Sequence, residues 1–263
     1  MDPAEAYDSY LVPAMFEPWS REVIQRAKVW NGDKVLDVAC GTGIVACRIA
    51  GTGATVTGFD LTPAMLDQAR KRAASERVTV KWVAGNAERL PFPDGSFDLV
   101  TCQQGLQYVP DRARAVREMR RVIAPGGRAV VACWAGLDHH PPYKVVDEVV
   151  RRHFGPGGFT LPFSLGDEAE LKQLLTAARF HAVAIDTVTR TVRFPDPAMF
   201  VAMSLTAAAG FFPDIVALEP AARAAKIEAA VAECTPALAS WIEGDHVVMQ
   251  KVSMLAVGRV KTV

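Results

Sequence analysis

Short apolar runs alternate with longer amphipathic stretches along the first half of the chain. Apolar runs of this length, bounded by glycine, proline or polar residues, are typical of strands buried in a parallel sheet. The stretches between them have helical spacing, and this alternation predicts strands joined by right-handed helical crossovers. We expect strands at 34–39, 54–59, 78–83, 97–102 and 128–134, and helices near 19–29, 43–50, 62–74 and 111–124.

The alternation of short strands and helices becomes less regular after residue 134. Helices are expected at 142–154 and 167–180, and the alternation over 183–194 predicts a long strand. Residues 198–243 form a mostly helical insert, and the alternation of apolar and polar residues over 247–260 predicts a last strand.

Composition narrows the class of protein. Half of the residues are apolar, and 29 Lys and Arg balance 29 Asp and Glu, so the chain can build a large core but lacks the basic excess of a nucleic-acid binder. The five cysteines are widely spaced without a CxxC pair, which indicates a reduced, cytoplasmic protein with no metal site. No leader pattern and no apolar run long enough for a membrane span is present.

The most informative segment is a glycine-rich loop between two acids. The run that ends in Asp37 leads into Gly41-Thr42-Gly43, and the next apolar run ends in Asp60. Such a strand, tight turn, helix and strand place the loop and both acids at the carboxyl edge of a parallel sheet, where a ribose-bearing cofactor binds.

Two cofactors are compatible with this segment. The string GTGIVA matches the GxGxxA pattern of dinucleotide folds, so an NAD(P)-dependent oxidoreductase is one alternative. Asp37, however, lies four residues before Gly41, where a carboxylate would repel a pyrophosphate but suits an amino group. Asp60 can accept both ribose hydroxyls in either case, and Asn86 offers a donor and an acceptor to an adenine edge. These features favour S-adenosylmethionine.

Four motifs in the same order and spacing carry a family resemblance. VLDVACGTG, GFDLTPAML, GNAERLPFPDGSFDLV and RVIAPGGRAVVACW resemble class I S-adenosylmethionine-dependent methyltransferases over roughly residues 20–135. The nearest branch is the small-molecule group that includes the ubiquinone/menaquinone C-methyltransferases. The resemblance implies an α/β fold with a doubly wound, Rossmann-like sheet of seven strands, mostly parallel with the last strand antiparallel, plus a helical lid insert.

The resemblance also assigns roles by position. Asp37, Gly41 and Gly43 would line the methionine end of the cofactor, Asp60 would hold the ribose, and Gln103 would pass beneath the cofactor. Many relatives carry an acid where this chain has Asn86, whose amide can still bond to adenine. The full set of expected cofactor-binding residues is Asp37, Ala39, Gly41, Thr42, Gly43, Asp60, Leu61, Met65, Gly85, Asn86, Ala87, Gln103 and Tyr10.

The sequence pattern and the family resemblance together predict how the chain divides into domains. Residues 1–30 form an N-terminal helical cover, 31–197 the cofactor-binding α/β domain, 198–243 the lid insert, and 244–263 the final strand of that domain. In similar enzymes the N-terminal helix folds over the cofactor, where the face of Tyr10 or its neighbour Tyr7 would attract the sulfonium. Both tyrosines are equally compatible with an ordinary helix face.

The apolar segment 198–212 is a lid over an apolar acceptor, a buried helix or a homodimer contact. His139 and His140 follow the fifth strand and are candidate general bases, although a surface loop explains them as well. The sequence thus predicts an S-adenosylmethionine-dependent methyltransferase that methylates an O, N or C nucleophile of a small, partly apolar molecule. A non-catalytic module that only binds S-adenosylmethionine is the other alternative.

Overall fold

A computed structural model describes residues 3–262 of the chain. The N-terminal part and the sheet-forming half are α1 (Pro3–Ala6), η1 (Tyr7–Phe16), α2 (Glu17–Ala27), β1 (Lys34–Val38), α3 (Ile44–Ala50), β2 (Thr55–Asp60), α4 (Pro63–Glu76), β3 (Val80–Ala84), β4 (Phe97–Gln103), η2 (Leu106–Tyr108), α5 (Arg112–Val122) and β5 (Ile123–Trp134). The remainder is η3 (Leu137–His139), α6 (Pro141–His153), η4 (Leu161–Phe163), α7 (Glu168–Ala177), β6 (His181–Pro195), α8 (Pro197–Ala209), α9 (Pro213–Val216), α10 (Pro220–Ala237), η5 (Ala239–Trp241), β7 (Ile242–Glu243) and β8 (His246–Arg259).

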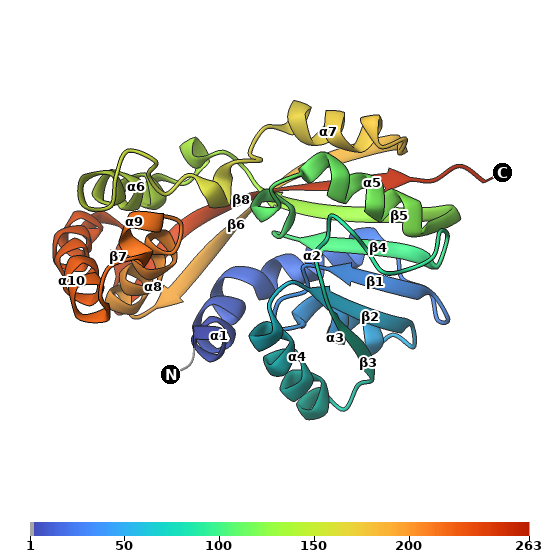
Figure 1. The fold of residues 1–263 in the computed structure, drawn as a ribbon, viewed down its shortest axis with the longest axis horizontal. Coiled ribbons are helices and arrows are strands. Elements are labelled where there is room, and N and C mark those ends of the chain that lie inside the picture. The colour runs from blue at the N-terminus through green and yellow to red at the C-terminus, as the bar shows by residue number, and fades with distance from the viewer. Residues whose placement is uncertain (1–2, 263) are drawn as a thin grey trace. The chain divides into compact units, whose positions relative to one another are not determined.

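The strands form one sheet in the order β3-β2-β1-β4-β5-β8-β6, and the short β7 pairs with β8 (Figure 1). Strands β1 to β5 pair in parallel, whereas β8 is antiparallel to β5, with Trp134 opposite Ser253. The carboxyl ends of β1, β2, β3 and β4 therefore share one edge of the sheet. The predicted Rossmann-like sheet with an antiparallel last strand is confirmed.

Buried apolar residues explain why these segments are strands and helices. Val35, Leu36 and Val38 of β1 are fully buried, as a central parallel strand requires. Helices α5 and α7 cover this sheet through residues such as Met119 and Leu175, which belong to one core cluster with the strand residues. Burial of these faces supplies the main stabilisation of the fold.

The fifth strand begins earlier than the sequence predicts, at Ile123 rather than at residue 128. Its pairing with β4 passes from Ile123 opposite Phe97 to Arg128 opposite Leu99, so the ladder with β4 is irregular between these pairs. In this interval the Gly127 carbonyl accepts from the Val260 amide at 2.9 Å. Asp111 caps α5 by accepting from the Arg114 amide at 2.8 Å, whereas the Thr62 side chain makes no capping bond to α4.

The chain divides into two compact units. The first comprises Met1–Ala135, Leu165–Val188 and Ser253–Val263, and the second comprises Gly136–Ser164 and Thr189–Val252. In the second unit α10 packs against α6 and α8. Its interior is rich in aromatic rings, among them Tyr143, Phe163 and Phe200. No helix among residues 3–262 is long and apolar enough to cross a membrane.

Candidate cofactor-binding site

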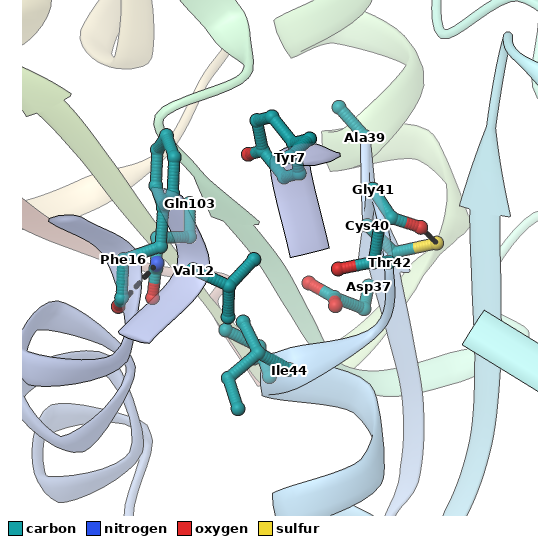
Figure 2. Close-up of a pocket in the computed structure, with 11 residues that line it drawn as sticks. Tyr7, Val12, Phe16, Asp37, Ala39, Cys40, Gly41, Thr42, Ile44 and Gln103 are labelled. Carbon is teal, nitrogen blue, oxygen red and sulfur yellow. Dashed lines mark hydrogen bonds between the residues drawn. The ribbon is translucent and has the colours of Figure 1, made fainter. Parts of the chain in front are cut away.

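The first unit contains a small cavity where the glycine loop meets the N-terminal segment. Its volume is about 30 Å³. Figure 2 shows side chains of η1 and the end of β4 facing those of the loop that follows β1. The lining residues are Tyr7, Val12, Phe16, Asp37, Ala39, Cys40, Gly41, Thr42, Ile44, Val45 and Gln103. Five of the residues predicted from the sequence are thus brought together: Asp37, Ala39, Gly41, Thr42 and Gln103.

The glycine loop has a backbone that side chains would obstruct. Gly41 and Gly43 have φ values of +54° and +83°, which favour glycine. A Cβ on Gly43 would also lie 2.6 Å from the ring of Trp82. Because α3 begins immediately afterwards at Ile44, the loop presents its backbone at the start of a helix, where a polar ligand can approach closely.

Asp37 is the most unusual residue of the cavity. Its side chain is 1% exposed, and Oδ1 accepts a 2.7 Å hydrogen bond from the Thr101 hydroxyl. Oδ2 is buried and has no hydrogen-bond partner among residues 3–262. Burial raises the pKa of this carboxyl to about 7, and the nearby negative charge of Asp60 adds to the shift. An ammonium group placed at Oδ2 would satisfy the free oxygen and favour the ionised carboxylate.

Asp60 connects the glycine loop to the end of β2. Its Oδ2 accepts from the Gly41 amide at 2.8 Å and its Oδ1 from the Thr62 amide at 2.9 Å. Burial raises the pKa of Asp60, while the backbone N–H groups act in the opposite direction. The carboxylate is thus an acceptor that backbone N–H groups hold in place at the end of β2.

The expected adenine-binding residues lie at the ends of β2 and β3 and do not line the small cavity. Leu61 is 68% exposed. Met65 is half-buried on α4. The Gly85 amide donates to the Asp60 carbonyl at 2.9 Å, which brings the two strand ends together.

The segment after β3 is arranged as a turn. Asn86 is exposed, and its Oδ1 accepts from the Glu88 amide at 2.8 Å. Ala87, between them, is half-buried. The Asn86 amide nitrogen lies at a long 3.5 Å from Glu88 Oε2, so this donor is only weakly engaged.

Gln103 joins the N-terminal segment to the sheet. Its Nε2 donates to the Phe16 carbonyl at 3.0 Å, an interaction drawn as a dashed line in Figure 2. Its Oε1 and the Thr42 hydroxyl are buried without hydrogen-bond partners in the described part of the chain. The cavity therefore has three such polar atoms, counting Asp37 Oδ2, and this polar lining fits a charged, hydroxyl-bearing cofactor.

The N-terminal segment supplies one of the two tyrosines considered from the sequence, together with two apolar residues that the sequence did not specify. Tyr7 lines the cavity, whereas Tyr10 is half-buried and does not. The Tyr7 ring would contact a Cβ on Gly41 at 4.0 Å, and burial raises the pKa of its phenol. Val12 and Phe16 line the cavity as well. Their apolar spacing predicted a helix face but not which part of the protein this face packs against.

The two candidate histidines belong to the second unit. His139 is exposed, whereas His140 is fully buried. The Val252 amide donates to His140 Nε2 at 3.1 Å, and His140 Nδ1 lies 3.2 Å from the Gly136 carbonyl. Burial lowers the pKa of His140 to about 3, and the positive charge of Lys251 contributes. Both ring nitrogens are committed to the backbone, which favours a structural role for His140.

No group of three or more metal-ligating side chains capable of holding an ion occurs within residues 3–262. The site is therefore described by the glycine loop, the two acids and the N-terminal segment. The mostly parallel sheet, with this loop after β1, is a Rossmann-like α/β arrangement, a class in which ligands bind at the carboxyl ends of the strands.

Comparison with known proteins specifies the kind of domain. Residues 36–131 match the family described as methyltransferase domain. The match spans β1 to β5 and includes both acids and the glycine loop.

Similar proteins include two quinone methyltransferases. The 2-phytyl-1,4-naphtoquinone methyltransferase of Synechococcus elongatus is 38% identical over 131 residues, covering 48% of this chain and 54% of the relative. The demethylmenaquinone methyltransferase of Staphylococcus aureus is 44% identical over 115 residues, covering 43% and 47%. The chain spans about half the length of these curated relatives.

Solved structures share the fold over nearly the whole chain. The YcgJ protein of Bacillus subtilis superposes with a TM-score of 0.62 at 22% identity and covers 93% of this chain and 98% of its own. Phosphoethanolamine N-methyltransferase 2 of Haemonchus contortus, solved in complex with S-adenosyl-L-methionine, gives a TM-score of 0.62 at 18% identity, covering 99% and 57%.

Proposed function

We propose that this protein is an S-adenosylmethionine-dependent methyltransferase that transfers a methyl group to an O, N or C nucleophile of a small, partly apolar acceptor. The observation that carries the proposal is the free, buried oxygen of Asp37 beside the glycine loop. The methionine part of the cofactor bears the ammonium group that this oxygen would accept, whereas a dinucleotide would place a pyrophosphate near the same negative charge.

The remaining cofactor contacts follow from the positions of the side chains. Asp60 accepts the ribose hydroxyls, the exposed face of Leu61 covers the adenine together with Met65, and the amide of Asn86 binds the adenine edge. Bound S-adenosylmethionine supplies a methyl group on a sulfonium, which is electrophilic without further activation. Gln103 and the N-terminal segment limit the access of water to this end of the site.

Catalysis then depends mainly on positioning. Holding two reactants in the correct geometry contributes on the order of 7–11 kcal/mol, enough for much of the rate enhancement without a dedicated base. A base is needed only where the acceptor must lose a proton, and the exposed His139 remains a candidate for that case.

The acceptor is proposed to be a quinone-type or similarly apolar ring compound. The names of the two relatives state quinone substrates, 2-phytyl-1,4-naphtoquinone and demethylmenaquinone. We propose that residues 198–243 contribute apolar contacts to the acceptor, since Met203 and Phe211 provide the adaptable surface that such rings require.

Calorimetry on the wild type and Asp60→Ala tests the cofactor assignment. Loss of two charge-assisted hydrogen bonds should weaken S-adenosylmethionine binding by about 2–5 kcal/mol. Asp67→Ala is the matched control, because Asp67 is an exposed acid on α4 that does not line the cavity. Equal affinity in Asp60→Ala and wild type would contradict the ribose assignment.

The alternatives give distinct results in the same assay. NADH binding without S-adenosylmethionine binding would indicate an oxidoreductase. Binding of S-adenosylmethionine without transfer of a labelled methyl group to any quinone or phenol acceptor would indicate a binding module. Transfer to a demethylated naphthoquinone is the outcome expected here.

A further inference from the structure

We propose that the ion pair between Asp8 and Arg72 is the latch of an N-terminal gate that controls entry and release of the cofactor. The proposal rests on the proposed function and extends it from the residues that bind the cofactor to those that govern its exchange. The gate is defined as α1 and η1, residues 3–16, which end where α2 begins at Glu17.

The gate occupies space that the cofactor requires. The cavity between η1 and the glycine loop is about 30 Å³, enough for roughly one or two water molecules but not for the methionine part of the cofactor. Tyr7, from the first turn of η1, lies against Gly41 of the glycine loop. The segment must therefore move outward before S-adenosylmethionine can reach Asp37.

The latch joins the gate directly to the cofactor loop. Asp8 Oδ1 and Arg72 Nη2 are 2.6 Å apart, and their side chains are only 27% and 16% exposed. The same guanidinium donates through Nε to the Thr42 carbonyl at 3.1 Å and through Nη1 to Glu76 at 3.3 Å. Arg72 thus holds the gate with one edge and the glycine loop with another, which makes it a positioning residue rather than a catalytic one.

The chain beyond the gate is anchored much more firmly. Glu17, the first residue of α2, pairs with Arg48 at 2.5 Å, and Trp19 is fully buried. The carbonyl of Ala27, at the end of the same helix, accepts from Arg128. Opening at the junction of η1 and α2 leaves these contacts intact.

The gate itself has the weak backbone that a moving segment needs. Its ten residues in η1 are π-helical, a rare geometry that is usually restricted to a single turn, and Pro13 lies inside it. Contacts from η1 to the rest of the unit include the Asp8 pair, the Gln103 bond to the Phe16 carbonyl, and the contact of Phe16 with Trp134. The Tyr7 ring lies against Gly41, and Val12 and Met15 are buried.

The test compares Asp8→Asn with Asp67→Asn. Asp67 forms a 2.6 Å pair with Arg70 on the same helix α4, but this pair is exposed and does not reach the gate. Association and dissociation rates of S-adenosylmethionine are measured by stopped-flow fluorescence and by a chase with unlabelled S-adenosylhomocysteine. Hydrogen exchange of the η1 amides is followed in the protein without cofactor.

Asp8→Asn should raise both rates about tenfold, with a much smaller change in Kd, because a charge-assisted contact of the closed gate is lost on both paths. Exchange of the η1 amides should rise as well. Asp67→Asn should leave all three unchanged. Arg72→Gln also loses the bond to the Thr42 carbonyl. It should raise both rates, and adding Asp8→Asn to it should raise them no further. High salt should accelerate exchange of cofactor in the wild type more than in Asp8→Asn.

Normal rates in Asp8→Asn, with or without faster η1 exchange, would overturn the gate. If only the dissociation rate changed, and Kd changed with it, Asp8 would be an ordinary stabilising contact. That result would also overturn the gate. Absence of S-adenosylmethionine binding in the wild type would instead overturn the proposed function, so the two failures are distinguishable.

Discussion

The Thr101 hydroxyl donates to one oxygen of Asp37 across the paired strands β1 and β4, and leaves the other oxygen without a partner among residues 3–262. A buried polar group in this condition destabilises a fold by about 1–3 kcal/mol, more when it is charged. Thr101 therefore holds Asp37 in one orientation and leaves its other oxygen free at the small cavity beside the glycine loop. A donor bound in the cavity would recover the stability that this free oxygen costs.

Asp37→Asn should bind S-adenosylmethionine at least about tenfold more weakly by calorimetry, because the charge that pairs with the ammonium group is lost. The same variant should be relatively more stable as pH rises. A carboxyl whose pKa rises from 3.8 to about 7 on folding contributes stability below 3.8 and loses it as the pH rises through about 7. The melting temperature of this variant relative to the wild type should therefore increase as the pH rises. A difference that stays constant with pH would contradict the raised pKa of Asp37.

The affinity of the wild type for S-adenosylmethionine should rise as the pH passes upward through about 7, where Asp37 ionises. Thr101→Val should move the midpoint of this rise to higher pH, because the hydrogen bond from Thr101 lowers the pKa of Asp37. Calorimetry over a pH series measures both. An identical profile in the two proteins would show that another group controls the titration.

Gly58→Ala should destabilise the protein by about 1–3 kcal/mol through overpacking. A Cβ on Gly58 would overlap the ring of Trp82 and approach Cys40 to 3.1 Å, and β2 is paired on both sides, so it cannot shift easily. Gly51→Ala is the control, since its nearest contact would be an ordinary 3.4 Å. Urea unfolding of both variants should show a loss of stability only at Gly58.

His140 should make the folded protein sensitive to acid. Its pKa is lowered from 6.5 to about 3 in the folded protein. As the pH falls below 6.5, this histidine is therefore protonated in the unfolded chain but stays neutral in the folded chain. Stability is therefore lost progressively from 6.5 down to about 3. His140→Gln should show a shallower fall in melting temperature over this range, whereas the exposed His139→Gln should match the wild type.

The order of elements was predictable because each strand and helix of the first unit carries its own local signal. The run before Asp37, the glycine loop and the proline at the start of α4 all specify their conformations with neighbours in sequence. The early start of β5 was missed because the proline and glycines at 125–127 signal a turn locally. The Gly127 carbonyl accepts from the amide of Val260, which is distant in sequence.

The pattern of residues by itself determined the class of fold, the acids at the ends of β1 and β2, and the glycine loop, since these depend on short-range hydrophobic periodicity and backbone freedom. Only the tertiary structure decided what lies against that loop. Asp8 and Arg72 are 64 positions apart, as are Asp37 and Thr101, and Gln103 reaches Phe16 across 87. Contacts of such separation arise from packing of the completed sheet and helices, because no local propensity specifies which distant side chain will fill a given space.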